Sequence, residues 1–337
     1  MKVGLMLGTE YPAGDDPGRR LAEHREQVRL AREAGFDLVG IPHHPSRGPS
    51  FWLPPLLTAA AVAGELGAMR LATTVFLLPL QHPVEVAEQV AMLDHLAGGR
   101  FVFGVGAGWQ QEEFRALGVP MDGRLGRLEE SLAVIERLWT GERVTFHGRH
   151  VVLDDVALTL RPAQRPRPPI WIGANASDAA VRRAARLADA WIVSSHPDID
   201  AVARHVETYR QALAELGKPF PAELPVLRNA YVAPDMDTAL AEARGYFEAS
   251  YEIFSDWGLF ERVLRAGVRQ LRGADLLRGR LIIGSPEDCL GQISACCEQV
   301  PIGCLILRMQ WLSMPHARVA RAIALAGEKL LPALRRL

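Results

Sequence analysis

Short apolar runs rich in Val, Ile and Leu alternate along the chain with longer segments in which apolar residues recur at the helical period. This alternation predicts parallel strands joined by helical crossovers, because a parallel neighbour can be reached only by a long return connection. Eight runs have the length and composition of buried strands: Val3–Leu7, Leu38–Ile41, Leu71–Leu78, Phe101–Val105, Ile170–Gly173, Ala190–Val193, Val226–Val232 and Cys304–Arg308.

The segments between these runs predict helices, and several carry terminal signals. Gly35 follows the first, Gly98 and Gly99 follow the third, and Ser285 and Pro286 have the residue types of an N-cap and a first helical position. The expected helices are Arg20–Ala34, Pro54–Gly67, Pro83–Leu96, Arg124–Trp139, Ser177–Leu187, Asp200–Leu216, one that begins at Ser285, and Pro315–Leu334.

Eight strands with helices between them predict an α/β fold of the closed (β/α)8 kind, a TIM barrel with insertions. An open doubly wound sheet usually carries a glycine fingerprint after its first strand, and here Gly8-Thr9-Glu10 stands there instead. The 337 residues fit one barrel domain over 1–337.

Two stretches of the chain depart from the repeat of strand and helix. Residues 144–160 alternate around Gly148, which predicts a hairpin outside the barrel, and weakly patterned residues 249–284 predict an insertion that acts as a lid.

Composition and charge limit the class of partner. Hydrophobic residues make up 49% and charged residues 23%, as in ordinary soluble proteins, and 38 Lys and Arg against 39 Asp and Glu give a net charge of −1. No excess of positive charge is present to hold nucleic acid or anionic lipid. The start of the chain has no signal-peptide pattern and no apolar stretch is long enough to cross a bilayer, so a cytoplasmic protein without a membrane partner is expected. The four cysteines have no metal-binding spacing, and no metal site is predicted.

Candidate chemistry is sought where the strands end, because the loops at the carboxyl ends form the active face of an α/β barrel. His43 and His44 follow the second strand, and imidazole can exchange protons near neutral pH. Neighbours on an extended segment point in opposite directions, so one of the two is expected to face the site. The alternative is a histidine that only packs the loop.

Two further strand ends have features of a ligand site. Gly104, Gly106 and Gly108 remove Cβ atoms where the fourth strand ends, which would let a flat ring lie against the backbone, although tight barrel turns use glycine without a ligand too. The turn from Gly173 to Asp178 could present backbone N–H groups to a phosphate, with Asn175 as a further donor. Its alternative is simple capping of the following helix by Ser177.

Taken together, these landmarks resemble the bacterial luciferase-like monooxygenases, whose members use FMN or coenzyme F420. The resemblance runs nearly end to end. The residues that carry it are Gly35-Phe36-Asp37, His44, Leu78–Pro83, Leu93-Asp94, Gly98–Phe101, Gly104–Trp109, Ile172–Ala174 and Gly284–Asp288.

The resemblance implies a barrel, usually dimeric, with the ring of the cofactor at the strands' carboxyl ends and its phosphate after the fifth strand. It implies a non-proline cis peptide around Thr74 and Val75 and makes His44 the active-site histidine. The chain departs from the pattern at His43, where an acid is common, and at Gly40, where tryptophan is common. Luciferase has a phosphate-binding arginine where Ala107 stands, which leaves Arg124 or Arg127 as candidates here.

The predicted function is oxidation of a small, largely apolar organic substrate by O2 with reduced FMN. No dinucleotide fingerprint is present, so a separate flavin reductase is expected to supply the reduced cofactor, and the oxygenase is expected to be a homodimer. Two alternatives remain: an F420-dependent dehydrogenase or reductase that transfers hydride without O2, and a flavin-binding protein without catalysis. The predicted site comprises catalytic His44 and His43, cofactor contacts Thr74, Val75, Ala107, Gly108, Gly173, Ala174, Asn175 and Ser194, and pocket walls Phe51, Trp52, Trp109 and Trp311.

Overall fold

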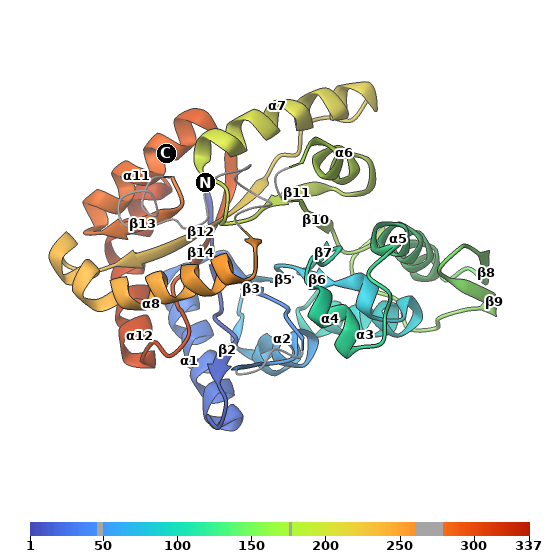
Figure 1. Ribbon diagram of the computed structural model, residues 1–337, viewed down its shortest axis with the longest axis horizontal. Helices are drawn as coiled ribbons and strands as arrows, with labels where there is room; N and C mark the ends of the chain where they lie inside the picture. The colour runs from blue at the N-terminus through green and yellow to red at the C-terminus, as the bar shows by residue number, and fades with distance from the viewer. Residues whose placement is uncertain (46–49, 175–176, 260–278) are drawn as a thin grey trace.

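Eight parallel strands close into a barrel in the computed structural model, which describes residues 1–45, 50–174, 177–259 and 279–337. They are hydrogen-bonded in the order β10, β11, β12, β14, β1, β3, β5 and β7, and β10 also pairs with β7, which closes the ring (Figure 1). Their bounds are β1 Lys2–Met6, β3 Leu38–Ile41, β5 Arg70–Thr73, β7 Phe101–Gly106, β10 Ile170–Ala174, β11 Ala190–Val193, β12 Leu224–Val232 and β14 Ile302–Arg308. The predicted (β/α)8 barrel is confirmed.

Helices cover the outside of the ring, and their ends follow the local sequence signals. The side chain of Asp16 accepts a hydrogen bond from Gly18 N at the start of α1, and Gly35 ends that helix with φ 85°. Ser285 and Asp288 form a capping box at the start of α11. The main helices are α1 Pro17–Ala34, α2 Pro55–Val62, α3 Pro83–Leu96, α5 Arg124–Thr140, α6 Asp178–Leu187, α7 Ile199–Glu215, α8 Met236–Asp256, α11 Pro286–Gln299, α12 His316–Leu325 and α13 Leu331–Leu334. None of these described helices is both long and apolar enough to span a membrane.

Two apolar layers hold the barrel together. The larger lies between strands and helices, and the smaller fills the barrel itself. Alternation along each strand produces this division, because successive side chains point to opposite faces. On β14, Cys304 and Ile306 belong to the inner cluster while Leu305 and Leu307 belong to the outer one.

The third predicted strand, Leu71–Leu78, is wrong as a single element. β5 ends at Thr73, a cis peptide joins Thr74 to Val75, and the chain continues as the two-residue β6 Phe76–Leu77 and the 3-10 turn η2 Leu78–Leu80. Apolar character continues through the break, which is why the sequence pattern does not reveal it. The cis bond lies where the family resemblance places it.

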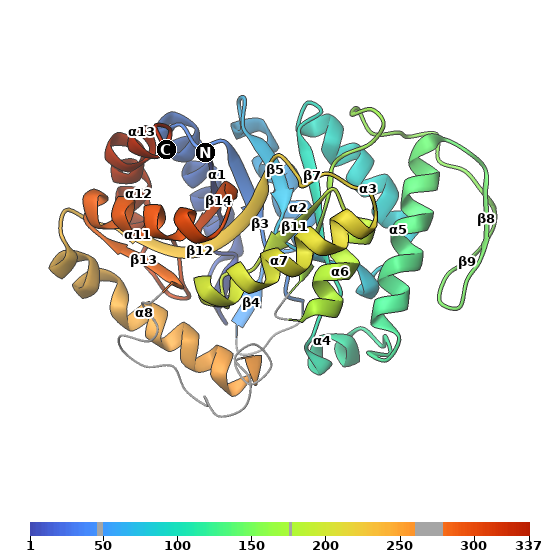
Figure 2. The ribbon, with the colours of Figure 1, turned by 90° about the horizontal axis from the view of Figure 1, so that it is seen from above.

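Several elements lie outside the eightfold repeat. Residues 144–160 contain an antiparallel pair, β8 Val144–His147 and β9 Val152–Val156, which projects from the side of the barrel beyond α5 (Figure 2). The segment predicted as a lid, residues 249–284, starts inside α8 and ends in β13 Leu281–Gly284, which pairs with β12. These ends are regular elements and not irregular chain, and 260–278 lie outside the described residues.

Three short elements border the carboxyl ends of the strands and were not expected from the sequence. β2 Glu10–Pro12 and β4 Ser50–Trp52 form an antiparallel pair, and α4 Gln111–Ala116 follows the end of β7. In Figure 2, β4, α4 and α8 lie at the same end of the molecule. These elements surround the mouth of the barrel.

Candidate active site

A cavity of about 410 Å³ opens at the carboxyl ends of the barrel strands. Its size lies within the range usual for small-molecule sites. Most of the predicted site residues line it: His43, His44, Trp52, Thr74, Val75, Ala107, Gly108, Trp109, Gly173, Ala174 and Ser194. The structure therefore brings together residues from six separate loops and strands. Asn175 lies outside the described residues.

His44 forms a hydrogen-bonded pair with a buried carboxylate. Its Nδ1 lies 2.7 Å from Oε1 of Glu113 on α4, and the Glu113 side chain is fully buried. The imidazole also meets the Trp52 ring edge to face, with 4.7 Å between ring centroids. Because Glu113 holds Nδ1, Nε2 is the ring nitrogen left to exchange a proton with a molecule in the cavity.

His43 has a different environment, although it also borders the cavity. Its Nδ1 accepts a hydrogen bond of 3.1 Å from Leu77 N, and its ring stacks on Phe76. Burial, with a smaller contribution from the charge of His44, lowers the pKa of His43 to about 3. A neutral imidazole that accepts a backbone hydrogen bond holds the loop after β5, so we assign His43 a positioning role and keep His44 as the candidate for proton transfer.

One wall of the cavity is built from small residues packed around Val75. A Cβ placed on Gly106 would lie 2.7 Å from Val75 Cγ2, and one placed on Gly173 would lie 3.3 Å from the same atom. Ala107, Gly108 and Ala174 continue this wall. The glycines therefore let three strand ends approach one another and leave a surface of low relief, against which a flat ring can lie.

Positive charge lies at the start of α6, at the other edge of this wall. Ser177 caps the helix by accepting a hydrogen bond from Ala180 N, and Arg124 and Arg183 line the cavity beside it. Arg183 also pairs with Glu129 at 3.0 Å, whereas Arg124 donates from Nε to the Gly108 carbonyl. Helix N–H groups together with two guanidinium groups suit an anion such as phosphate.

Asp178 does not oppose an anion at this helix start. Its Oδ1 accepts a hydrogen bond from Thr208 on α7, and Asp178 does not belong to the cavity wall. Arg127, the other arginine considered for phosphate, also lies away from the cavity and donates to the Pro120 carbonyl. Of the two arginines suggested by sequence, Arg124 is the one in position.

Two predicted pocket residues, Phe51 and Trp311, are not among the described residues that line this cavity. Phe51 and Trp52 are neighbours on β4 and point in opposite directions, so Trp52 borders the cavity while Phe51 packs on Tyr11 with 5.8 Å between ring centroids. Trp311 is 1% exposed and packs against Tyr231 and Phe247 in the outer core. The chain turns after β14, which carries Trp311 away from the barrel mouth.

The structure also places residues at the site that the predicted set does not contain. Arg308 and His196 line the cavity, and Glu113 holds His44. Burial and the neighbouring cation Arg308 lower the pKa of His196 to about 3. Arg308 could have been found from the sequence, because it continues the alternation of the inward-facing Cys304 and Ile306. Glu113 could not, because it is 69 residues from its partner and lies in a helix of only 6 residues.

The wall contains polar atoms that a flavin-like ligand could satisfy. Within the described part of the chain, Thr74 Oγ1, Ser194 Oγ and Trp52 Nε1 are buried without a hydrogen-bond partner, and all three residues line the cavity. Buried polar groups in proteins are normally paired. A planar ring with polar edges, seated on the wall around Val75 and ending in a phosphate near Ser177, fits these residues.

Two relatives of known function are similar to this chain over most of its length. A 4-hydroxyprotoasukamycin monooxygenase of Streptomyces nodosus subsp. asukaensis is 30% identical over 302 residues, which cover 87% of this chain and 81% of the relative. The oxygenase component of a flavin-dependent trigonelline monooxygenase of Acinetobacter baylyi is 24% identical over 274 residues, covering 80% and 75%.

A solved structure and a family match extend the likeness over the whole barrel. The crystal structure of monooxygenase RslO1 from Streptomyces bottropensis superposes with a TM-score of 0.86 at 26% identity, covering 99% of this chain and 100% of that one. The luciferase-like monooxygenase family matches residues 1–301. The chain therefore belongs to the luciferase-like monooxygenase family.

Proposed function

We propose that the protein is the oxygenase component of a two-component flavin monooxygenase, which uses reduced FMN and O2 to oxidise a small organic molecule. The observation that carries the proposal is the His44–Glu113 pair at the edge of a cavity that has a flat wall of small residues and a cationic end. Reduced FMN, when bound, supplies the two electrons with which one atom of O2 enters the substrate and the other leaves as water.

Each part of the cavity has a role in this reaction. The wall around Val75 would carry the ring, while Arg124, Arg183 and the start of α6 would hold the phosphate. Phe254, Trp257 and Leu259 line the mouth and reduce the access of water. His44 gives or takes a proton at Nε2, and Glu113 keeps the ring in one orientation and tautomer.

Cofactor binding tests the first half of the proposal. Fluorescence titration of the purified protein with FMN should give micromolar binding, and riboflavin should bind more weakly because it lacks the phosphate. Arg124→Met should weaken FMN binding about tenfold and leave riboflavin binding unchanged, since the lost interaction is a charge-assisted hydrogen bond to phosphate. Arg127→Met is the matched control and should bind FMN like the wild type.

Turnover tests the second half. With NADH, a flavin reductase, FMN and air, a substrate from a screen should gain one atom of oxygen from isotopically labelled O2. His44→Ala should reduce turnover about 100-fold or more while FMN affinity stays the same. Binding of F420 in place of FMN, with substrate reduced or oxidised in the absence of O2, would establish the hydride-transfer alternative instead. FMN binding without turnover of any substrate would favour a non-catalytic flavin-binding protein.

The partner proteins are part of the same proposal. A separate reductase is required because the chain has no dinucleotide fingerprint, and the trigonelline relative is itself named an oxygenase component. We propose that the oxygenase is located in the cytoplasm together with this reductase.

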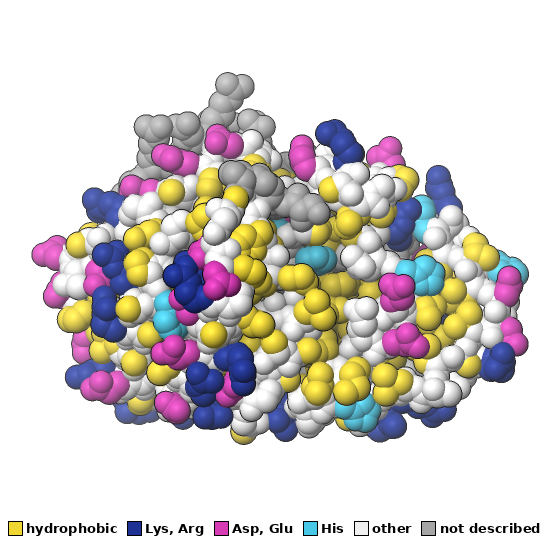
Figure 3. All heavy atoms as spheres, turned by 90° about the horizontal axis from the view of Figure 1, so that it is seen from below, with side chains coloured by type: hydrophobic (Ala, Val, Ile, Leu, Met, Phe, Trp, Pro, Cys, Tyr) yellow, Lys and Arg dark blue, Asp and Glu magenta, His cyan; other side chains and the backbone are white. Residues whose placement is uncertain are grey.

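A homodimer is the assembly we propose. Leu57 on α2 and Met92 and Leu96 on α3 are exposed by 70%, 46% and 44%. On the face seen in Figure 3, hydrophobic side chains gather between more highly charged ends. An apolar surface of this kind is typical of a contact between subunits. Light scattering of the purified protein measures the assembly directly, and a monomer at micromolar concentration would contradict the proposal.

A further inference from the structure

Arg308 is a buried cation that faces the interior of the barrel mouth. It is the last residue of β14 and continues the inward alternation of Cys304 and Ile306, and it lines the cavity with only 7% of its surface exposed. Around the ring, β14 is reached from β7 through β10, β11 and β12, so Arg308 lies across the barrel from the wall of small residues. It is therefore remote from the arginines assigned to the phosphate.

The guanidinium of Arg308 has unused hydrogen-bonding capacity. Its Nε donates to the Gln310 carbonyl at 3.1 Å, and among the described residues neither Nη atom has a hydrogen bond and no carboxylate lies within ion-pair distance. Burial lowers the pKa of Arg308 below its usual value. The negative charge of Glu10 opposes this shift from a distance, without an ion pair. A buried cation without an ion-pair partner is costly, so its retention at a cavity wall points to a ligand that pairs with it.

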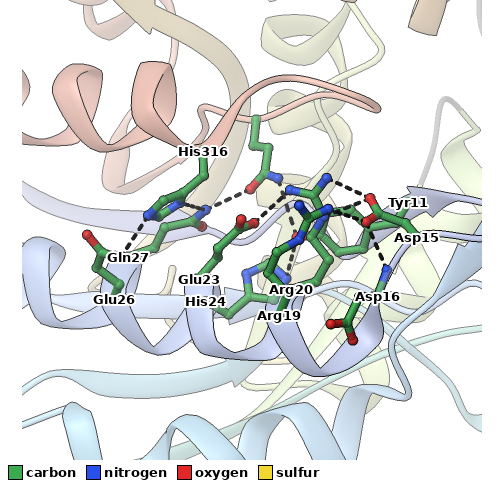
Figure 4. Close-up of polar contacts among 11 residues, drawn as sticks. Tyr11, Asp15, Asp16, Arg19, Arg20, Glu23, His24, Glu26, Gln27 and His316 are labelled. Carbon is green, nitrogen blue, oxygen red and sulfur yellow. Dashed lines mark hydrogen bonds and ion pairs between the residues drawn. The ribbon is translucent and has the colours of Figure 1, made fainter.

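Gln310, whose carbonyl accepts the hydrogen bond from Arg308, is itself fixed by a buried polar network. Gln310 accepts a hydrogen bond from Gln27 Nε2 at 3.0 Å and donates to the Tyr11 hydroxyl at 3.4 Å. Tyr11 in turn meets His24 Nε2 at 2.8 Å, and Figure 4 shows how these side chains of α1 and the β2 strand converge. Arg308 is thereby anchored at Nε, and its two Nη groups remain available in a defined direction.

We propose that the substrate carries a carboxylate, which Arg308 binds through its Nη groups. The proposal rests on the proposed function, because it names the class of molecule that this same site oxidises. A guanidinium fork matches the two oxygens of a carboxylate, and the pair is strong where water is excluded. Met6, Leu227 and Phe254 also line the cavity, so the rest of the molecule is apolar. This refines the expectation of a largely apolar substrate.

Calorimetric titration tests the proposal with pairs of probes that share an apolar body and differ in charge. Octanoate is compared with octanamide, and phenylacetate with phenylacetamide, in protein saturated with FMN. We expect each carboxylate to bind about tenfold more tightly than its amide, as a desolvated charge-assisted pair requires. Arg308→Met should abolish this preference and leave amide affinity unchanged, and Arg308→Lys should retain part of it because it keeps the charge without the fork. Arg127→Met should behave like the wild type.

Three results would overturn the proposal. The first is the absence of a carboxylate preference in the wild type, including the absence of any binding. The second is a preference that persists in Arg308→Met. The third is a preference present without FMN and lost when FMN binds, since Arg308 would then serve the cofactor. FMN affinity is measured first on the same protein, so a failure of the proposed function is seen separately, and the probe pairs are then compared in the FMN-free protein.

Discussion

At the residue scale, two adjacent histidines both border the cavity but have different hydrogen-bond partners. The Nδ1 of His43 accepts a hydrogen bond from Leu77 N, and burial lowers the pKa of this imidazole to about 3, whereas the Nδ1 of His44 is hydrogen-bonded to Glu113. In the proposed reaction, proton transfer at His44 would depend on a carboxylate that is not among the residues lining the cavity. In that reaction Glu113 would act as a positioning residue, and its contribution can be separated from that of His44 by mutation.

Glu113→Gln should lower kcat about tenfold or more while leaving the KM for substrate and the affinity for FMN close to wild type. The amide keeps the size of the side chain but no longer fixes one tautomer of His44. In a His44→Ala background the same change should have no further effect on kcat, because the imidazole that Glu113 orients is absent. Steady-state kinetics of the four proteins measure this. Equal additional losses in both backgrounds would mean that Glu113 supports the structure of α4 and not the histidine.

The placement of a single side chain could be predicted from the sequence where a local rule determines which way it points. Sequence position placed His44, Thr74 and Gly173 at the mouth because strand ends converge there in any α/β barrel. Trp311 packs away from the cavity, because a residue beyond a strand end follows the path of the loop, which alternation does not determine. Glu113 was missed because its importance comes from a contact across 69 residues.

At the element scale, β7 depends on a close approach that only glycine allows. A Cβ on Gly104 would overlap the Thr73 carbonyl oxygen of β5, and Thr73 Oγ1 donates to the Gly104 carbonyl at 2.7 Å. Backbone atoms cannot move aside as a flexible side chain can. Gly104→Ala should therefore lower the free energy of unfolding by about 1 to 3 kcal/mol or more.

Gly245 supplies the matched control for this prediction. It lies exposed within α8, and an added Cβ would have no atom of the described residues within 4 Å. Gly245→Ala should raise the free energy of unfolding by about 0.5 to 1 kcal/mol, because alanine loses less backbone freedom on folding. Urea unfolding of the two variants and the wild type measures both changes. A Gly104→Ala protein as stable as wild type would contradict the packing argument.

Elements were predicted well where their ends carry their own signals. Pro83–Leu96 was expected and found with the same bounds, since proline suits the first turn and Gly98 and Gly99 stop the helix. The break between β5 and β6 was not visible, because Leu71 to Leu78 are apolar on both sides of it. The β2–β4 pair was missed because each strand is three residues long and gains its hydrogen bonds from a partner distant in sequence.

At the scale of the whole molecule, the barrel folds around histidines that have lost access to water. Burial lowers the pKa of His24 to about 4 and that of His43 to about 3. Both side chains are almost fully buried, the first on the inner face of α1 and the second against the loop after β5. In the unfolded chain the same groups titrate near their ordinary pKa of 6.5, so folding is linked to proton release.

Between about pH 6.5 and pH 4 the unfolded chain binds more protons at these two positions than the folded protein does, so stability must fall as pH is lowered. Each histidine contributes a slope of up to about 1.4 kcal/mol per pH unit. His43→Asn should make the slope shallower by that amount, because asparagine offers an oxygen to Leu77 N but takes up no proton. Urea unfolding at pH 7, 6 and 5 measures the slope. His24→Asn should produce a similar reduction at an independent position, and two variants that kept the wild-type slope would show that these histidines already carry their protons in the folded barrel.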